Sequence, residues 1–285
     1  MSVALNVGLF GVGAIGQILA MALDADPSRA VLVAIADQDR PRAEQLAAQL
    51  KARPPVVEID ELVRRSDLII EAASQGALAE IVPRGLRAQK DLMVMSVGGL
   101  LEHDEWFPEA ERQGCRIHIP SGAIAGLDGL RAAAMGRLSL VILTSRKPLA
   151  ALRGARYLTE HRIDLDRLKE PTVLFDGPPE EACRAFPSTS NVAASLRIAA
   201  GKSVEIRVRV IAVPGGSENV HEIQAVGDFG RFRILLENVP SPSNPRTSRL
   251  AALSAIATLE EIIHNQKVRV ERPKTCAAQP ISGAK

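Results

Sequence analysis

The stretch Leu5–Gly16 reads LNVGLFGVGAIG, an alternating apolar segment that runs straight into glycines at positions 11, 13 and 16. An apolar run with helical periodicity follows it. This order predicts the strand, glycine turn and helix of a dinucleotide-binding unit. The first glycine permits the tight turn, the second lets the backbone approach a pyrophosphate, and the third lets the helix pack closely on the strand. Free N–H groups at the start of the helix face the phosphate charge. The cofactor-binding residues predicted in this turn are Gly11, Gly13, Ala14, Ile15 and Gly16.

A carboxylate stands where such a unit needs one. The second apolar run, Ala30–Ala36, ends at Asp37, about 20 residues after the glycine turn. A carboxylate at this place accepts hydrogen bonds from the adenosine ribose and repels a 2′-phosphate, which favours NAD. Arg40 follows shortly after and could instead accept the extra phosphate of NADP. We predict NAD as the cofactor, with NADP use left open; a glycine-rich turn that binds no nucleotide is the plainer alternative.

Further apolar segments alternate with helical ones along the first 120 residues. Strands are predicted at 67–73, 92–96 and 116–120. Such alternation predicts an α/β fold with a doubly wound parallel (Rossmann) sheet, in which the carboxyl ends of the strands share one edge. Ligands bind at that edge. Ser96 and Gly98 end one strand and are predicted to contact the cofactor, although a simple strand-end turn explains them equally well.

The pattern changes after residue 120, where strand-like runs predict a second, α+β domain with a mixed sheet. These runs lie at 138–144, 203–213, 220–226 and 229–237. Asn244-Pro245 then predicts the start of a helix. Apolar residues at helical spacing predict that this helix packs back on the first domain, namely Leu250, Leu253, Ile256, Leu259 and Ile263. The predicted division is a dinucleotide-binding domain (1–120), a catalytic and substrate domain (121–245), a C-terminal helix (246–266) and a flexible tail (267–285).

Composition argues against several other classes of protein. The formal net charge is only +2 and aromatic residues make up 3%, so no nucleic-acid partner is expected. The apolar runs are shorter than the 18 to 20 or so residues that span a membrane, and the first residues lack the features of a secretion signal, so the cytoplasm is expected. Three scattered cysteines, Cys115, Cys183 and Cys276, predict neither a disulfide framework nor a metal site.

Several motifs resemble, in combination, those of one known family. They are the glycine turn, Ser96-Val97-Gly98, Ser121-Gly122-Ala123-Ile124, Phe186-Pro187 with Asn191-Val192-Ala193, His221-Glu222-Ile223, and Glu237-Asn238 through Asn244-Pro245-Arg246-Thr247-Ser248. To about residue 265 the chain resembles the L-aspartate dehydrogenases, nicotinamide-dependent enzymes that oxidise the amine of aspartate to an imine. The resemblance implies that Ala123 and Asn191 contact the nicotinamide half of the cofactor and that His221 is catalytic. It also implies a homodimer, and an imine product that supplies quinolinate synthesis in NAD biosynthesis.

The chemistry of amine oxidation gives its own reason to look for a histidine. The reaction removes a hydride from Cα, takes a proton from the amine and adds water to the imine, so it needs a base that titrates near neutral pH. His221 follows the turn-forming segment 214–217 and starts a strand, where its side chain can project into a cleft between domains. A structural, hydrogen-bonded histidine is the plainer alternative. Glu222, the next residue, is expected on the opposite face of the strand.

Candidate substrate ligands lie in two other segments. Asn244, Arg246, Thr247 and Ser248 offer an amide, a guanidinium and hydroxyls that suit a dicarboxylate, with plain helix capping as the alternative, favoured for Asn244. Lys147, with Arg146 beside it, is a further cationic candidate for the side-chain carboxylate, unless the two form an exposed basic turn. For Asn191, helix capping is likewise the plain alternative.

We therefore predict an NAD(P)-dependent oxidoreductase that reversibly deaminates L-aspartate, a small-molecule substrate, to iminoaspartate and then to oxaloacetate and ammonia. A reductase of a cyclic imine or a semialdehyde has the same two-domain plan and is one alternative. A non-catalytic NAD(H)-sensing protein is the other.

Overall fold

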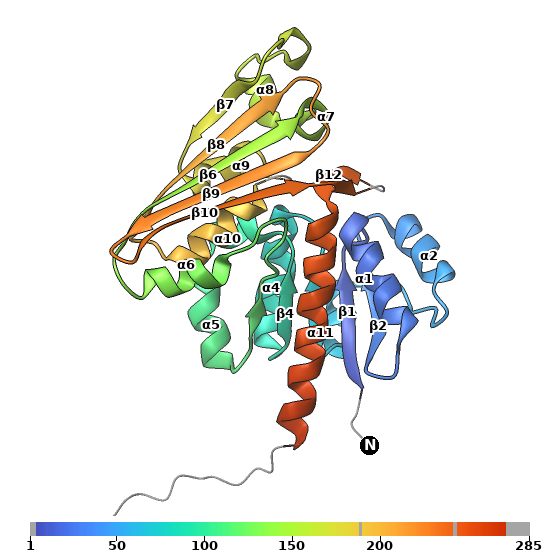
Figure 1. Cartoon of the computed structure of the whole chain (residues 1–285). Coiled ribbons are helices and arrows are strands. Elements are labelled where there is room, and N and C mark those ends of the chain that lie inside the picture. Colours follow the sequence, from blue (N-terminus) through green and yellow to red (C-terminus); the bar gives the residue numbers. More distant parts are fainter. Residues whose placement is uncertain (1–3, 188–189, 242–243, 272–285) are drawn as a thin grey trace, which may run out of the picture.

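A computed structural model describes residues 4–187, 190–241 and 244–271, and of residues 244–246 and 266–271 it describes the backbone alone. The first half is a five-stranded sheet, called sheet A below, in which every neighbouring pair of strands is parallel. The strand order β2-β1-β3-β4-β5 confirms the predicted doubly wound topology (Figure 1). The strands are β1 (Leu5–Phe10), β2 (Ala30–Ala36), β3 (Leu68–Glu71), β4 (Asp91–Val94) and β5 (Ile117–His118).

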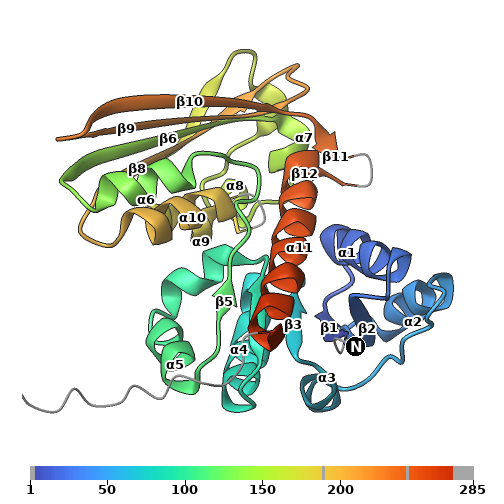
Figure 2. The ribbon, with the colours of Figure 1, turned by 60° about the horizontal axis from the view of Figure 1, so that its bottom comes forward.

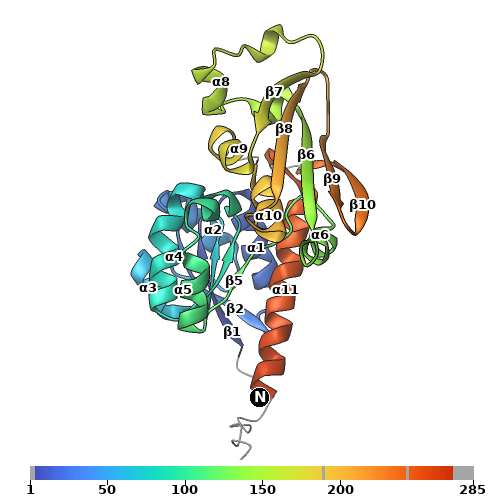
Figure 3. The same ribbon diagram turned by 90° about the vertical axis from the view of Figure 1, so that its left-hand side faces the viewer.

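Helices cover both faces of sheet A. One face carries α1 (Ala14–Ala25), α2 (Arg40–Gln49) and the last helix of the chain. The other face carries α3 (Ile59–Arg65), α4 (Leu78–Arg87) and α5 (Trp106–Gln113), as Figure 3 shows from the side. All four residues of β3 are buried, because a strand in the middle of such a sheet is covered on both faces. Two short 3₁₀ helices, η1 (Gln75–Ala77) and η2 (Val97–Glu102), follow β3 and β4.

The second half forms a five-stranded sheet, called sheet B, with the order β10-β9-β6-β8-β7. β6 is parallel to β8 and antiparallel to β9, and the two outer pairs are antiparallel, so the predicted mixed sheet is confirmed. The strands are β6 (Leu138–Pro148), β7 (Thr172–Gly177), β8 (Glu205–Val213), β9 (Asn219–Gly227) and β10 (Gly230–Asn238). β7 lies outside the strands that the sequence predicted.

A layer of helices separates the two sheets. α6 (Leu127–Ala134), α9 (Pro179–Ala185) and α10 (Asn191–Ala200) lie under sheet B on the side that faces sheet A (Figure 2). α7 (Leu149–Leu152), α8 (Arg156–Glu160) and η3 (Leu165–Arg167) connect β6 to β7. No helix in the described part of the chain is both long and apolar enough to cross a membrane.

The chain returns to sheet A through a small hairpin and a long helix. β11 (Pro240–Ser241) pairs with β12 (Asn244–Ser248), and α11 (Arg249–Glu271) then runs past α1 (Figure 1). The prediction that Asn244-Pro245 opens the helix is wrong, because these residues belong to β12. Proline is tolerated there because a strand of a two-stranded hairpin is an edge strand. The helix continues to Glu271, through residues that the sequence assigned to the tail.

The buried side of α11 also differs from the predicted stripe. Leu250 and Leu253 are 37% and 51% exposed, so they do not face the core. The later part of the predicted stripe is confirmed, because Ile256, Leu259 and Ile263 pack on the first domain. Ala255 and Ile262, which the stripe did not include, pack there too. Arg29 adds an ion pair to Glu260, with 2.6 Å between Nη1 and Oε2. Helical spacing predicts a helix correctly, but the side that is buried depends on the neighbours it meets.

The two faces of α11 can be separated by truncating one leucine on each. Leu259→Ala should lower the free energy of unfolding by about 2 to 4 kcal/mol, because it leaves a cavity in the core. Leu253→Ala, on the exposed face, should change it by less than about 0.5 kcal/mol. Urea denaturation followed by circular dichroism measures both values. Equal losses in the two variants would contradict the packing described here.

Candidate active site

The three glycines of the turn differ in whether packing against the rest of the protein requires them. Gly11 has a φ of +99°, and a Cβ there would lie 2.5 Å from the backbone nitrogen of Ala73. A Cβ on Gly16 would lie 2.2 Å from the carbonyl oxygen of Gly11. At Gly13 the nearest atom to such a Cβ is Ala72 O at 3.4 Å, an ordinary contact. Packing therefore requires two of the glycines, whereas the third leaves open backbone at the start of α1, which fits a bound pyrophosphate.

A cavity of about 420 Å³, called the first cavity below, opens beside this turn. Gly11, Gly13, Asp37 and Arg40 are among the residues that line it. The Asp37 carboxylate accepts hydrogen bonds from the N–H groups of Val12 and Asp39, at 2.6 and 2.8 Å. It thus fixes the glycine turn relative to the end of β2. The remaining predicted residues of the turn, Ala14, Ile15 and Gly16, form the first turn of α1.

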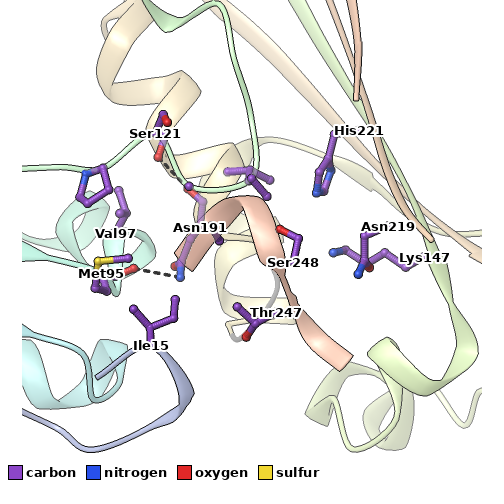
Figure 4. A pocket seen from close by; sticks show the side chains of 16 residues that line it. Ile15, Met95, Val97, Ser121, Lys147, Asn191, Asn219, His221, Thr247 and Ser248 are labelled. Carbon is purple, nitrogen blue, oxygen red and sulfur yellow. Dashed lines mark hydrogen bonds between the residues drawn. The ribbon is translucent and has the colours of Figure 1, made fainter. Parts of the chain in front are cut away.

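A second cavity, of about 100 Å³, lies where the carboxyl edge of sheet A meets sheet B (Figure 4). It brings together residues from both halves of the chain that are far apart in sequence. The predicted site residues that line it are Ile15, Ala123, Asn191, Lys147, His221, Thr247 and Ser248. For Asn244 and Arg246 the side chains lie outside the described part of the chain. The two cavities lie on either side of the glycine turn, as the two halves of a dinucleotide require.

His221 lies on β9 and is 2% exposed. Its Nδ1 is 2.9 Å from the hydroxyl of Ser145, which is its register partner on β6. This contact orients the ring and leaves Nε2 as the nitrogen that can exchange a proton with a ligand. Burial holds the pKa of His221 well below its usual value, and the positive charge of Lys147 lowers it further. The imidazole is therefore neutral at neutral pH, which is the form that a base needs.

Lys147 lies on the same face of sheet B as His221. It is 3% exposed, so the alternative of an exposed basic turn is wrong for this residue. Burial lowers the pKa of its ammonium group to about 8. Arg146 points to the opposite face, where its Nη1 lies 3.5 Å from Glu222 Oε2. The opposite orientation predicted for Glu222 is confirmed, and Lys147 is the cation that lines the cavity.

Asn191 joins the second domain to the edge of sheet A. Its Oδ1 accepts a hydrogen bond from the N–H of Gly98 at 3.1 Å. Its Nδ2 donates one to the carbonyl oxygen of Met95 at 3.2 Å, which Figure 4 shows as a dashed line. The helix-capping alternative is wrong, because Ser190 occupies the N-cap of α10. Nearby, Gln75 Nε2 donates to the carbonyl oxygen of Pro187 at 3.0 Å. No sequence pattern predicted this second link.

Glu71 is a buried carboxylate at the edge of sheet A that sequence reasoning missed. Its fully buried carboxylate accepts hydrogen bonds from Ala73 N and Ser96 Oγ at 2.8 Å and from Ser96 N at 2.9 Å. The Ser96 hydroxyl, predicted to contact the cofactor, is thus bonded to Glu71. Burial raises the pKa of Glu71. A charged residue at the end of an apolar, buried strand is a signal that could have found it.

Two further asparagines are buried at the site, and the sequence analysis gave neither of them a role. Asn238, at the end of β10, donates from Nδ2 to the carbonyl oxygen of Ala123 at 3.0 Å and so fixes one wall of the second cavity. Asn219, at the start of β9, lines the same cavity. No sequence pattern around either residue predicts a structural or chemical role for it. Within the described residues, no group of three or more His, Cys, Asp and Glu side chains is placed to hold a metal ion.

Comparison with known proteins gives one consistent family. A family model described as "Aspartate dehydrogenase, C-terminal" matches residues 128–262, and one described as "Homoserine dehydrogenase, NAD binding domain" matches residues 11–120. The L-aspartate dehydrogenase of Methanosarcina acetivorans is 46% identical over 264 residues, which cover 91% of this chain and 97% of that protein. That of Nitrosopumilus maritimus is 38% identical and covers 90% of this chain and 96% of its own.

Solved structures share the fold. The aspartate dehydrogenase of Thermotoga maritima has a TM-score of 0.65 at 21% identity, covering 95% of this chain and 99% of that one. GenD2 from gentamicin A biosynthesis, solved in complex with NAD, has a TM-score of 0.54 at 14% identity, covering 96% and 90%. At these identities the likeness concerns the arrangement of the two domains.

The buried Lys147 should cost stability. With a pKa of about 8 instead of the usual 10.5, its charged form disfavours the folded state by roughly 3 kcal/mol near neutral pH. Lys147→Met should therefore raise the free energy of unfolding by roughly 1 to 3 kcal/mol at about pH 7. The gain should shrink as the pH rises above about 8 and be clearly smaller at about pH 9.5, because the buried lysine of the folded wild type is then neutral. What remains is the cost of removing its proton, which falls as the pH approaches the ordinary pKa of the unfolded chain.

Urea denaturation at the two pH values measures this difference. Lys169→Met, at an exposed position, is the matched control and should change the free energy of unfolding by less than about 0.5 kcal/mol. A loss of stability in Lys147→Met would mean that the ammonium group is held by favourable partners, contrary to our prediction.

Proposed function

This chain belongs to the L-aspartate dehydrogenase family, and we propose that the second cavity is where it oxidises L-aspartate to iminoaspartate with a nicotinamide cofactor. Hydrolysis of the imine gives oxaloacetate and ammonia, and the reaction is reversible. The observation that carries the proposal is that a neutral buried histidine, His221, and a buried cation, Lys147, share one cavity with Ile15 of the glycine turn. A cation beside the base suits an anionic substrate better than it suits a cyclic imine.

The residues of the two cavities fit a dinucleotide. The open backbone at Gly13 and the start of α1 would hold the pyrophosphate, and Asp37 would hold the adenosine ribose. Ala123 and Asn191 would contact the nicotinamide half from the second cavity. When bound, the nicotinamide accepts the hydride that leaves Cα of the substrate.

His221 then handles the protons of the reaction. Its neutral Nε2 accepts a proton from the ammonium group of aspartate, so that a lone pair on nitrogen assists the loss of the hydride. His221 then releases this proton to solvent, which accounts for the one proton that the oxidation liberates. In the hydrolytic half, the same nitrogen, neutral again, accepts a proton from the water that adds to the imine carbon and donates it to the nitrogen that leaves as ammonia. Ser145 keeps the ring in one orientation through both halves. The substrate carboxylates would be bound by the ammonium of Lys147, the hydroxyls of Thr247 and Ser248, and the predicted ligands Asn244 and Arg246.

NAD is the proposed cofactor, rather than NADP. The carboxylate of Asp37 faces the first cavity, and Arg40 there is already paired with Glu44 at 3.0 Å and Glu58 at 3.5 Å. An arginine held by two carboxylates is less available to a 2′-phosphate. The ratio of kcat/KM for the two cofactors tests this preference, and a ratio that favours NADP would overturn it.

A homodimer in the cytoplasm is the proposed state of the protein. The outer face of sheet B exposes apolar side chains, Val226 and Leu235 among them, which would be covered in a dimer. Cys115 and Cys183 are buried free thiols, in keeping with a reducing compartment. Light scattering measures the mass in solution, and a monomer at micromolar concentration would contradict the dimer.

The proposed reaction predicts that NADH absorbance rises when L-aspartate is added to the protein and NAD at alkaline pH. His221→Ala should lower kcat by about 100-fold or more, because the described lining of the cavity holds no other histidine and no carboxylate. Its affinity for NADH, measured by fluorescence titration, should stay within about twofold of the wild type. His264→Ala, which removes an exposed histidine, is the control and should retain full activity.

Other results of the same activity assays would support one of the two alternative functions. Turnover of a cyclic imine or a semialdehyde without any turnover of aspartate would support the reductase. Tight NADH binding without turnover of any of these substrates would support the sensor. Full activity in His221→Ala would remove this residue from its proposed role.

A further inference from the structure

A buried amide in the second cavity has no hydrogen-bond partner among the described residues. Asn219 is 2% exposed, and within that part of the chain neither its Nδ2 nor its Oδ1 makes a hydrogen bond. The hydroxyl of Ser248, in the wall of the same cavity, is likewise buried and without a partner among these residues. Buried amides are nearly always paired, because an unpaired donor or acceptor loses its bonds to water without compensation. An amide with both ends free at the wall of a cavity therefore points to a ligand that supplies the missing partners.

The register of sheet B places Asn219 in a polar row. His221 pairs with Ser145 on β6, and one further pair joins Val220 to Arg146. The ladder between β6 and β9 ends at this pair. One residue further along each strand stand Lys147 and Asn219, which both line the cavity, and Figure 4 shows their side chains toward one end of it. This row lies two residues along the strands from His221, or about 7 Å, and on the same face of the sheet.

Asn238, the third member of the row, already has a hydrogen-bond partner. Asn238 on β10 is the direct register partner of Asn219, and its amide donates to Ala123 O. Lys147 and Asn219 thus remain as the pair that can meet a ligand: an ammonium group and a neutral N–H donor. Both are donors suited to a carboxylate.

We propose that Asn219 is a specificity-determining residue, whose Nδ2 binds the side-chain carboxylate of the substrate together with the ammonium of Lys147. This inference rests on the proposed function, which places the amine of the substrate at His221. The α-carboxylate is attached to the reacting carbon itself, whereas the side-chain carboxylate is one carbon further away. The row that is displaced from His221 along the strands therefore fits the side-chain carboxylate.

The neutral amide also has an electrostatic reason to be there. The charge of Lys147 already lowers the pKa of His221. A second cation at position 219 would lower it further and weaken the base. An asparagine adds a directional hydrogen bond without another charge, and its Oδ1 suits the Lys147 ammonium one strand away.

The test compares two substrates that differ only in the side chain, L-aspartate and L-alanine. Asn219→Asp places a negative charge against the side-chain carboxylate, and kcat/KM for aspartate should fall by about 100-fold or more. Asn219→Ala, which only removes the donor, should lower it by about tenfold. The value for alanine should change by less than about threefold in both variants. Gln224→Glu is the matched control, because it makes the same change of amide to carboxylate on the outer face of β9 and should leave both values unchanged.

Binding gives a second readout that does not depend on turnover. Calorimetric titration of the NADH-loaded protein with succinate, an unreactive diacid, should show at least about tenfold weaker binding in Asn219→Asp, while binding of butyrate should be nearly unchanged. Equal losses for aspartate and alanine, or for succinate and butyrate, would overturn the inference and leave the proposed function intact. Absence of aspartate turnover in the wild type would instead contradict the proposed function, and selective loss of succinate binding would still support the carboxylate site.

Discussion

The amide of Asn191 is the interaction on which the geometry of the site depends. The carboxyl edge of a parallel sheet presents backbone donors and acceptors that have no strand to pair with. An asparagine amide carries one of each kind, and Asn191 uses both, toward Met95 O and Gly98 N. These bonds fix the start of α10 against sheet A. Because sheet B lies on α10 and its neighbouring helices, they also set where His221 stands relative to the glycine turn (Figure 2).

The side chains on the inner face of sheet B change from apolar to polar along the strands. Over most of β6 and β9 it is apolar, with Val141, Leu143 and Ile223 buried against the helices. In the last steps of the ladder it becomes polar, and these steps lie over the edge of sheet A. Buried polar groups destabilise a fold unless they are paired. The site is therefore confined to one end of a sheet whose remaining length supplies the apolar burial.

Sequence reasoning succeeded where a feature depends on local order and failed where it depends on contacts. The glycine turn and the apolar parallel strands carry their structure in their own residues, and strand alternation correctly separated His221 from Glu222. Glu71 and Asn219 gained their importance only from neighbours supplied by other strands. The start of α11 was misplaced because Pro245 is compatible with both a first helical turn and an edge strand. The buried face of that helix was predicted correctly at Leu259 and Ile263 but not at Leu250 and Leu253, because spacing defines a stripe but not where neighbours cover it.

The cation and the base in the second cavity constrain each other. Both side chains are buried, and a positive charge on one disfavours a positive charge on the other. Lys147 and His221 are therefore not readily charged at the same time. A carboxylate placed beside Lys147 stabilises its ammonium form and offsets its effect on the imidazole. The part of the pKa depression at His221 that Lys147 causes is then relieved, while the part caused by burial remains. In the binding mode proposed above, a diacid would thus make His221 a stronger base, and a ligand without the second carboxylate would gain less of this effect.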